Sequence, residues 1–510
     1  MEKIPTQPIK SFFWLFGLLS LLTFNIWLIN QGSGFTIPRE LLFRTEADIM
    51  RPIIAFPIIL TILLLVKKFL FSHFKKFNQK KKIILIFSVC LISAFSLFNT
   101  TQTNPDYGRY LTEAKYLTKN GVVEYLQNWG EFQFAADMPI MPFIYGIVFW
   151  LFGEGQLAVL IVNFLIFLGI LWFTYLISKQ LFDQKIALFS IILLSTAHII
   201  ITQTPHFLVD LAQTFFLTLS FYLLLRLIQS PSLKQAVGAG LILFLTSLTK
   251  IFSIIFLISF LIVSFIWVIL KKRKENVFCS LVVTWGVMTL LDLLYVLWKK
   301  DIFYELVFRY ASPERIIFTL TPLVVGGIFL LFLIILAKKY LDRFYFALPL
   351  LFYILLTWLF FFGQKYAFYL KTIFVAANIP LAILFFSSIY FAFKKKSIAA
   401  LMLLPWSLAP IFIPNTMFKY QIPSYPAIMM LASFSLTSLF KNYKRQIRYL
   451  LVILASSISI TYFFFLPMIQ NHIKVNIRQA AEYANQFQPK KIVILFFPIG
   501  KYGEELSKYI

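Results

Sequence analysis

Residues 99–138 read NTTQTNPDYGRYLTEAKYLTKNGVVEYLQNWGEFQFAADM, a polar island inside a chain that is otherwise almost continuous apolar sequence. The island follows an apolar run that ends near residue 98, and it leads into another apolar run, 138–152. It holds five of the 21 acidic residues of the chain, namely Asp106, Glu113, Glu124, Glu131 and Asp137. A segment this rich in carboxylates, set between membrane spans, is where we expect the chemistry of the protein.

The composition excludes a soluble domain. Hydrophobic residues make up 60% of the 510 residues and charged residues 13%, with a mean hydropathy of +0.82. Too little polar surface exists to cover this apolar mass in water. The apolar runs have the length of single helical spans, whereas barrel strands would alternate over roughly ten residues. The sequence therefore predicts an all-α polytopic membrane protein with about fifteen spans.

The first apolar run, 11–30, is too long for a signal peptide core and no small-residue cleavage site follows it, so we expect a retained span. The predicted spans are 11–30, 52–66, 82–98, 156–178, 186–203, 207–228, 236–250, 251–270, 277–297, 316–337, 344–362, 372–393, 397–414, 421–440 and 449–467. With the N-terminus in the cytoplasm, every lysine-rich cluster between these spans also falls in the cytoplasm, as the positive-inside rule requires. The polar island and the C-terminus then lie outside, in a multi-pass protein of the cell membrane.

The net charge of +26 follows from these dispersed clusters. Nucleic-acid binding would instead concentrate basic residues on one surface, so no nucleic-acid partner is expected. Several outer loops also carry lysine or arginine, against the general bias. Positive charge on the outer side indicates an anionic ligand at that face.

Within the island, Asp106 is placed to cap a helix over 107–120, and Gly121 marks the end of that helix. The following apolar stretch, 138–152, contains Pro139 and Pro142 and is too short to span the membrane. It predicts an interfacial or re-entrant helix.

Three carboxylates share the outer face in this topology. Asp106 follows a span, Asp137 precedes the short helix, and Asp210 lies near the outer start of a span. Carboxylates at membrane depth are costly and mark functional sites by default, so we expect these three to meet in one cleft.

Several short motifs occur in a defined order and on one side of the membrane. They are NPDYGRY (104–110), ADMPIMPFIY (136–145), WLFG (150–153), FLVD (207–210), LTK (248–250) and KYQIPSYP (419–426). From about residue 82 to its end the chain resembles the GT-C superfamily of glycosyltransferases, especially the protein O-mannosyltransferase and aminoarabinose transferase branch. The resemblance divides the chain into additional N-terminal spans (1–81), a catalytic membrane module (82–467) with an external loop at 99–155, and a short external tail (468–510).

The resemblance implies a reaction. A hydroxyl of the acceptor attacks the anomeric carbon of a hexose or pentose carried on a polyprenyl phosphate, with inversion, at the external face. The first-loop aspartate of the family acts as general base, and Asp106 matches it, with Asp137 and Asp210 as further catalytic carboxylates. Because the leaving phosphate needs cations, Lys250 and Lys419, with Tyr420, are the candidate donor-phosphate residues. Candidate accessory residues are Arg109, His206 and Arg309. Asp292 and Arg315, at predicted outer positions, are further accessory candidates that no motif supports.

Simpler interpretations exist for each of these residues. Asp106 could serve simply as a helix cap, and Asp137 could be a solvated loop residue. Asp210 and Lys250 could lie at the membrane interface with their charged groups in water. His206 and Asp210 are four residues apart, a spacing that occurs in metal sites. Because only these two ligands are evident, a histidine at the membrane interface is favoured over a metal ligand. The segment before the short helix lacks the basic partner that many family members carry. The cofactor is unknown, and a divalent metal is left open.

Two other functions compete with the transferase. A transporter or flippase of polyprenyl-linked saccharides would have broken helices near the bilayer midplane and repeated halves, and the sequence shows neither clearly. A saccharide polymerase would typically centre on a large late loop, whereas the substantial loop here is early. The sequence leaves open which sugar is moved and whether the acceptor is a lipid, a glycan or a protein.

Overall fold

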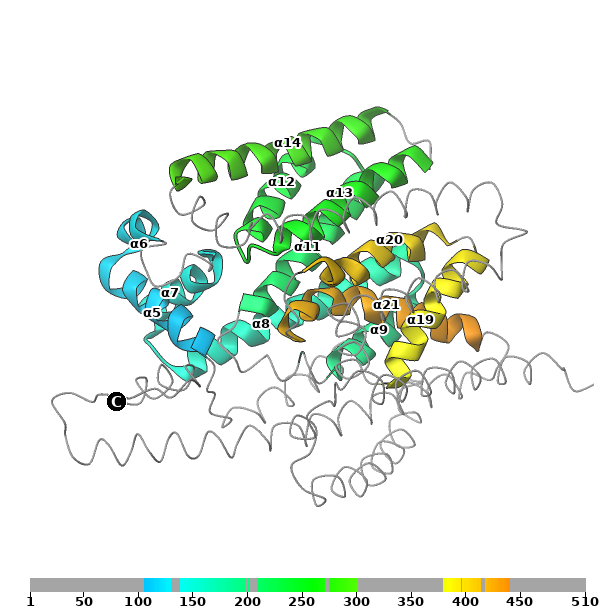
Figure 1. Cartoon of the computed structure of the whole chain (residues 1–510), viewed down its shortest axis with the longest axis horizontal. Helices are drawn as coiled ribbons and strands as arrows, with labels where there is room; N and C mark the ends of the chain where they lie inside the picture. The colour runs from blue at the N-terminus through cyan, green and yellow to red at the C-terminus, as the bar shows by residue number, and fades with distance from the viewer. Residues whose placement is uncertain are drawn as a thin grey trace, which may run out of the picture.

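The computed structural model describes residues 105–129, 138–197, 200, 209–270, 275–300, 379–395, 397–413 and 418–440. In this part of the chain all regular secondary structure is helical. The elements, labelled as in Figure 1, are α5 (Pro105–Asn120), α6 (Val122–Asn128), α7 (Ile140–Phe152), α8 (Gln156–Leu181), α9 (Gln184–Ser195), α11 (Val209–Gln229), α12 (Leu233–Ser247), α13 (Ser253–Leu270), α14 (Glu275–Trp298), α19 (Ile379–Lys394), α20 (Ile398–Leu408), the 3-10 helices η1 (Ala409–Phe412) and η2 (Phe418–Ser424), and α21 (Tyr425–Leu439). The all-helical membrane architecture is confirmed.

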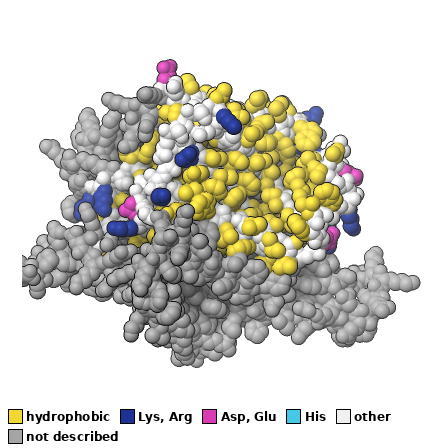
Figure 2. Space-filling model, turned by 180° about the vertical axis from the view of Figure 1, so that it is seen from behind, with side chains coloured by type: hydrophobic (Ala, Val, Ile, Leu, Met, Phe, Trp, Pro, Cys, Tyr) yellow, Lys and Arg dark blue, Asp and Glu magenta, His cyan; other side chains and the backbone are white. Residues whose placement is uncertain are grey.

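Four helical stretches in the described residues are long and apolar enough to cross a membrane. They are Leu157–Leu181, Val209–Gln229, Glu275–Trp298 and Tyr420–Leu439. Shorter apolar helices accompany them, and each of these elements falls on a predicted span or on the predicted short helix. Figure 2 shows a broad hydrophobic face with Lys, Arg, Asp and Glu side chains mostly at its borders, as expected of a surface in contact with lipid. The predicted spans within 1–104, 301–378 and 441–510 lie outside the described residues.

Helix directions follow from the packing. The rings of Phe173 on α8 and Tyr222 on α11 are 5.4 Å apart near the late halves of both helices, and Phe182 stacks on Phe434 near the ends of α8 and α21. Helices α8, α11 and α21 therefore run in the same direction, and α12, which follows α11 after a short turn, runs back. The starts of α11 and α21 thus share one end of the bundle with the end of α12.

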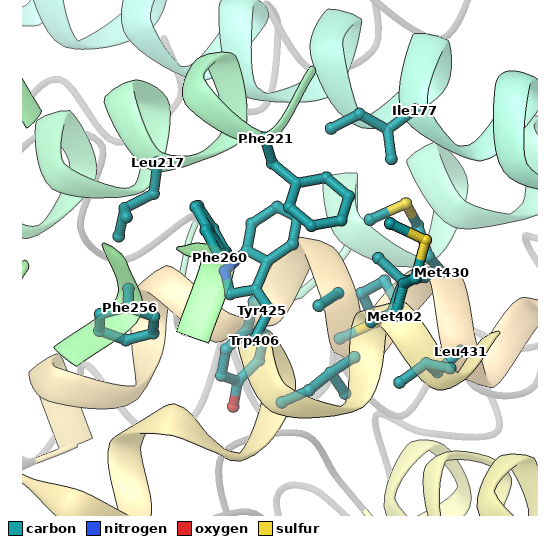
Figure 3. Close-up of a cluster of buried hydrophobic side chains, with 14 of the residues drawn as sticks. Ile177, Leu217, Phe221, Phe256, Phe260, Met402, Trp406, Tyr425, Met430 and Leu431 are labelled. Atoms are coloured by element: carbon teal, nitrogen blue, oxygen red, sulfur yellow. The ribbon is translucent and has the colours of Figure 1, made fainter. Parts of the chain in front are cut away.

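Three aromatic residues join α11, α13 and α20 in the core shown in Figure 3. Phe221, Phe260 and Trp406 have ring centroids 5.0 to 5.3 Å apart. The indole Nε1 of Trp406 also donates a 2.8 Å hydrogen bond to the carbonyl oxygen of Pro423, within η2. Because a buried indole N–H requires a partner, this bond fixes η2 relative to the core. It holds the segment that carries Tyr420 beside α11, against which η2 packs.

The first-loop helices α5, α6 and α7 form a group at one end of the molecule, beside one end of α14 (Figure 1). Helix α7 packs closely on α5, since a Cβ added to Gly146 would lie 2.9 Å from Leu117 Cβ. Gly121 lies between α5 and α6 with a φ of +87°, a backbone conformation that residues with a side chain rarely adopt. The predicted short helix and the helix end at Gly121 are both confirmed.

The predicted start of the first-loop helix was wrong. Helix α5 already includes Pro105, so Asp106 lies inside its first turn rather than at a capping position before residue 107. A proline fits this place because the first turn of a helix has no partner for its backbone N–H groups, and the fixed φ of proline is already helical.

Candidate active site

Lys250 lies in the turn that joins α12 to α13. Helix α12 ends at Ser247, and Thr249 Oγ1 then donates a 2.7 Å hydrogen bond to the carbonyl oxygen of Thr246. Side chains that bond to the carbonyl oxygens of the preceding turn compete with the helical pattern, which explains why a polar cluster ends an apolar helix here. The backbone N–H of Ser253 donates to the carbonyl oxygen of Lys250 at 2.9 Å and starts the next helix.

Asp210 and Lys250 form a buried ion pair. Lys250 Nζ is 2.5 Å from Asp210 Oδ1, and the two residues expose only 8% and 1% of their surface. Asp210 stands in the first turn of α11, where the positive end of the helix dipole favours a carboxylate. Lys250 Nζ also lies 4.2 Å from the centroid of the Tyr420 ring, which places η2 against the same ammonium group. Buried charges survive only with such partners, so the three residues define one polar site.

A chain of hydrogen bonds supports this pair. Gln213 Nε2, one turn after Asp210, donates to Ser253 Oγ at 3.0 Å, and Ser253 Oγ is 3.0 Å from Thr249 Oγ1. All three side chains are buried. The network ties the start of α11 to the turn that carries Lys250, and a fully connected buried network holds its members in one arrangement.

The first-loop helices close over this end of the bundle. Tyr110 of α5 lies in a buried cluster with Val209 and Ala212, which lie one residue before and two residues after Asp210 on α11. The neighbour of Lys250 in the turn, Leu248, lies in a second cluster with Trp129 of the first loop. The predicted outer-face elements therefore meet at one end of the molecule.

Of the predicted site residues, the structure brings together Asp210, Lys250 and Tyr420. Asp106 and Arg109 lie on α5, with Asp106 one turn before Tyr110, and Lys419 lies on η2 directly before Tyr420. The side chains of these three, and all of Asp137, His206 and Arg309, lie outside the described residues.

Two further carboxylates, one partly buried and one buried, lie on α14 and on α5. Asp292 of α14 accepts a 2.6 Å hydrogen bond from Ser247 Oγ, at the end of α12. The sequence indicated Asp292 only by its place near an outer span end. Glu113 of α5 is 3% exposed, and it follows Tyr110 by three residues, so both lie on the inward-facing side of α5. The helical spacing within the predicted helix 107–120 was the available signal, and it was not applied to Glu113.

The residues that the structure describes contain no group of three or more His, Cys, Asp and Glu side chains arranged to hold a metal ion. His206, which the sequence places four residues before Asp210, lies outside those residues.

The sequence model of the dolichyl-phosphate-mannose-protein mannosyltransferase family matches residues 137–298. The fold is similar to that of ArnT from Cupriavidus metallidurans. The comparison with the apo form gives a TM-score of 0.50 and 14% identity, and it covers 84% of this chain and 87% of ArnT. The comparison with the form bound to undecaprenyl phosphate gives a TM-score of 0.52 and 14% identity, and it covers 85% of this chain and 88% of ArnT. The archaeal oligosaccharyltransferase AglB from Archaeoglobus fulgidus, in complex with an inhibitory peptide and a dolichol-phosphate, matches with a TM-score of 0.48 and 14% identity over 84% of this chain and 64% of AglB. A sequence comparison with curated proteins finds no match.

The fold and the placement of the site define a polytopic helical membrane protein with a first loop packed over one end of its bundle. The matched segment contains Asp210 and Lys250, the two residues of the buried ion pair. These findings give the chain a fold similar to that of ArnT and, over residues 137–298, a similarity to the protein mannosyltransferase family.

Proposed function

We propose that this chain is a GT-C-type membrane glycosyltransferase, rather than a transporter, a flippase or a polymerase, and that it moves a sugar from a polyprenyl-phosphate donor to a hydroxyl of the acceptor, with inversion, at the external face of the membrane. The buried group of Asp210, Lys250 and Tyr420 is the observation that carries the proposal. It supplies a cation with an aromatic neighbour at the end of the bundle that the first-loop helices cover. ArnT, whose fold is similar, has been crystallised with undecaprenyl phosphate, which supports a carrier of this chemical class.

In the proposed reaction, the oxygen of the acceptor hydroxyl forms a bond to the anomeric carbon of the sugar. The bond from that carbon to the phosphate oxygen breaks, and the phosphate leaves with the electron pair. The proton of the hydroxyl passes to the carboxylate of Asp106, the general base. A positioned base of this kind accelerates such a step roughly 100- to 10,000-fold. No proton is needed by the leaving phosphate, because it is stable as an anion beside Lys250 and Lys419.

The other predicted residues take supporting roles in this proposal. Asp210 holds Lys250 in place until the phosphate arrives, and Tyr420 covers the ammonium group. Asp137 joins Asp106 and Asp210 as a carboxylate of the same cleft. Arg109, His206 and Arg309 contribute accessory contacts, and a divalent metal remains an open part of the mechanism. The acceptor is a lipid, a glycan or a protein.

The replacement Asp106→Asn tests the catalytic assignment. It keeps the size of the side chain but removes the basic carboxylate, so transfer should fall at least about 100-fold while expression and membrane insertion stay normal. Mass spectrometry of lipid-linked and surface glycans in a deletion strain, complemented with each variant, reports the loss of product and the accumulation of donor.

A matched control is Glu154→Gln, which changes a carboxylate near the first-loop helices that forms a half-exposed ion pair with Lys115 at 2.9 Å. Exposed ion pairs contribute about 0 to 1 kcal/mol, so this variant should transfer at the wild-type rate. Near wild-type transfer by Asp106→Asn would remove Asp106 from the role of base.

The proposed orientation has the N-terminus in the cytoplasm and the C-terminus and first loop outside. It follows from the positive-inside distribution of the lysine-rich clusters. With Cys90 and Cys279 replaced by serine, a cysteine introduced as Glu154→Cys should react with an impermeant reagent added outside, and one introduced as Lys185→Cys should not. The opposite labelling pattern would invert the proposed topology.

A further inference from the structure

Four consecutive residues, Ser247 to Lys250, each contact a different neighbour of the turn between α12 and α13. Ser247 Oγ bonds Asp292 of α14, and the carbonyl oxygen of Leu248 accepts a 3.3 Å hydrogen bond from the N–H of Ile140 at the start of α7. Thr249 joins the Ser253 network, and Lys250 pairs with Asp210 of α11. This turn is thus held from several sides, and the position of the Lys250 ammonium depends on all of these contacts.

Among the residues that contact this turn, Asp292 has no role in the proposed mechanism. It lies in α14, a helix of 24 residues that is apolar over most of its length. A carboxylate inside a membrane-spanning helix is costly, and such residues are functional-site candidates by default. Its Oδ1 lies 2.6 Å from Ser247 Oγ, whose hydroxyl also approaches the carbonyl oxygen of Phe244 at 2.7 Å. The carboxylate therefore reaches across to the last residue of α12, three residues before Lys250.

The interface between α12 and α14 makes this hydrogen bond geometrically specific. A Cβ added to Gly240 would lie 2.7 Å from the carbonyl oxygen of Thr284, so the two backbones approach closely. At that level Thr284 Oγ1 donates a 3.1 Å hydrogen bond to the carbonyl oxygen of Ala236. Since packed helices do not slide freely, Asp292 is held at a fixed height relative to the turn.

We propose that Asp292 is a positioning residue, which accepts the hydrogen bond of Ser247 and thereby fixes the turn that presents Lys250 to the donor phosphate. Asp210 holds the lysine from the α11 side, and Asp292 holds the start of the turn from the α14 side. When the phosphate takes Lys250 away from Asp210, the Ser247 contact keeps the turn in place. This inference rests on the proposed function, because it assigns Lys250 to the phosphate.

The test uses the purified full-length protein in detergent and undecaprenyl phosphate as the probe. The variants Asp292→Leu and Ser247→Ala each remove the hydrogen bond, and each should weaken binding about tenfold, the loss expected for one hydrogen bond to a charged group. The double variant should bind as weakly as either single variant, because both changes remove the same interaction. Asp292→Asn keeps an acceptor oxygen and should stay within about twofold of the wild type.

Two controls separate positioning from general packing. Thr284→Val removes a different hydrogen bond between α14 and α12, far from the turn, and should leave binding of the probe unchanged. Undecaprenol, which lacks the phosphate, should bind equally to the wild type and to Asp292→Leu. Should Asp292→Leu fold poorly, Ser247→Ala supplies the same test with a smaller change.

Wild-type binding of undecaprenyl phosphate by Ser247→Ala and Asp292→Leu would overturn the inference, as would equal weakening by Thr284→Val. The variant Lys250→Met distinguishes this failure from a failure of the proposed function. If Lys250→Met loses the probe and Asp292→Leu does not, only the positioning role is wrong. If Lys250→Met binds the probe as the wild type does, Lys250 is not the phosphate residue and both proposals fall.

Discussion

The two ends of the helical bundle carry positive charge in different ways. At the end where α8, α11 and α19 finish, the basic side chains that the structure describes are exposed, and they are Lys179, Lys185, Arg226, Lys234, Lys394 and Lys395. At the opposite end Lys119 and Lys300 are exposed as well, but Lys250 is buried, paired with Asp210 and covered by Tyr420. The exposed basic side chains are scattered over helix ends, whereas Lys250 belongs to a single site built from three elements.

This difference separates charge that orients the protein from charge that can act on a ligand. An exposed lysine at the end of a span keeps its hydration and biases the topology. A buried ammonium group has lost that hydration and depends on its partners, so it is expensive unless it has a task. An anionic ligand that replaces the Asp210 carboxylate would restore the same compensation, which is why we assign the donor phosphate to this end.

Breaking the buried pair should have the largest effect. The replacement Lys250→Met leaves the Asp210 carboxylate buried without its cation, and removal of one partner of a buried pair costs about 3 to 5 kcal/mol. We expect a large fall in the unfolding midpoint in detergent together with loss of transfer.

The double replacement of Lys250→Met with Asp210→Leu sharpens this test. Apolar residues of similar size often replace a buried ion pair without loss of stability. Stability should therefore return in the double variant, while transfer stays absent. A double variant that transfers sugar would show that the pair serves the fold alone.

Removing the aromatic cover of Lys250 should have a moderate effect. A cation over an aromatic ring in a partly buried place contributes about 0.5 to 2 kcal/mol, so Tyr420→Leu should weaken donor binding several-fold. Tyr420→Phe keeps the ring over Lys250 and should bind the donor nearly as the wild type does. Equal losses in both variants would instead assign the effect to the phenol hydroxyl, and titration of each purified variant with undecaprenyl phosphate distinguishes the two results.

The sequence predicted the helices and the placement of Asp210, Lys250 and Tyr420 at one end of the bundle, because both depend on strong local signals. Apolar runs set the length of each span, and the lysine-rich clusters set the direction, so Asp210, Lys250 and Tyr420 were assigned to one end before any contact was known. Whether Lys250 pairs with Asp210 or lies at the interface was open, because the pairing depends on how α11 and the turn after α12 pack.

Other features could not be predicted, because they arise from tertiary packing. The hydrogen bond between Ser247 and Asp292 joins residues 45 positions apart on two apolar helices, and neither residue belongs to a motif. The start of α5 was misplaced by two residues because aspartate and proline both occur at helix starts, and the sequence did not decide which one begins the helix.

The smallest effect is expected at the exposed basic end. Lys185 is the second residue of α9, where the Asp183 side chain accepts hydrogen bonds from the backbone N–H groups of Lys185 and Ile186 at 2.7 and 2.8 Å. Because this cap uses backbone groups, Lys185→Ala keeps it, and stability should change by no more than about 0.5 kcal/mol. Asp183→Ala removes the cap and should cost about 1 kcal/mol. Unfolding of both variants in detergent measures the contrast, and a loss at Lys185 as large as that at Lys250 would mean that the two ends do not differ in how they hold charge.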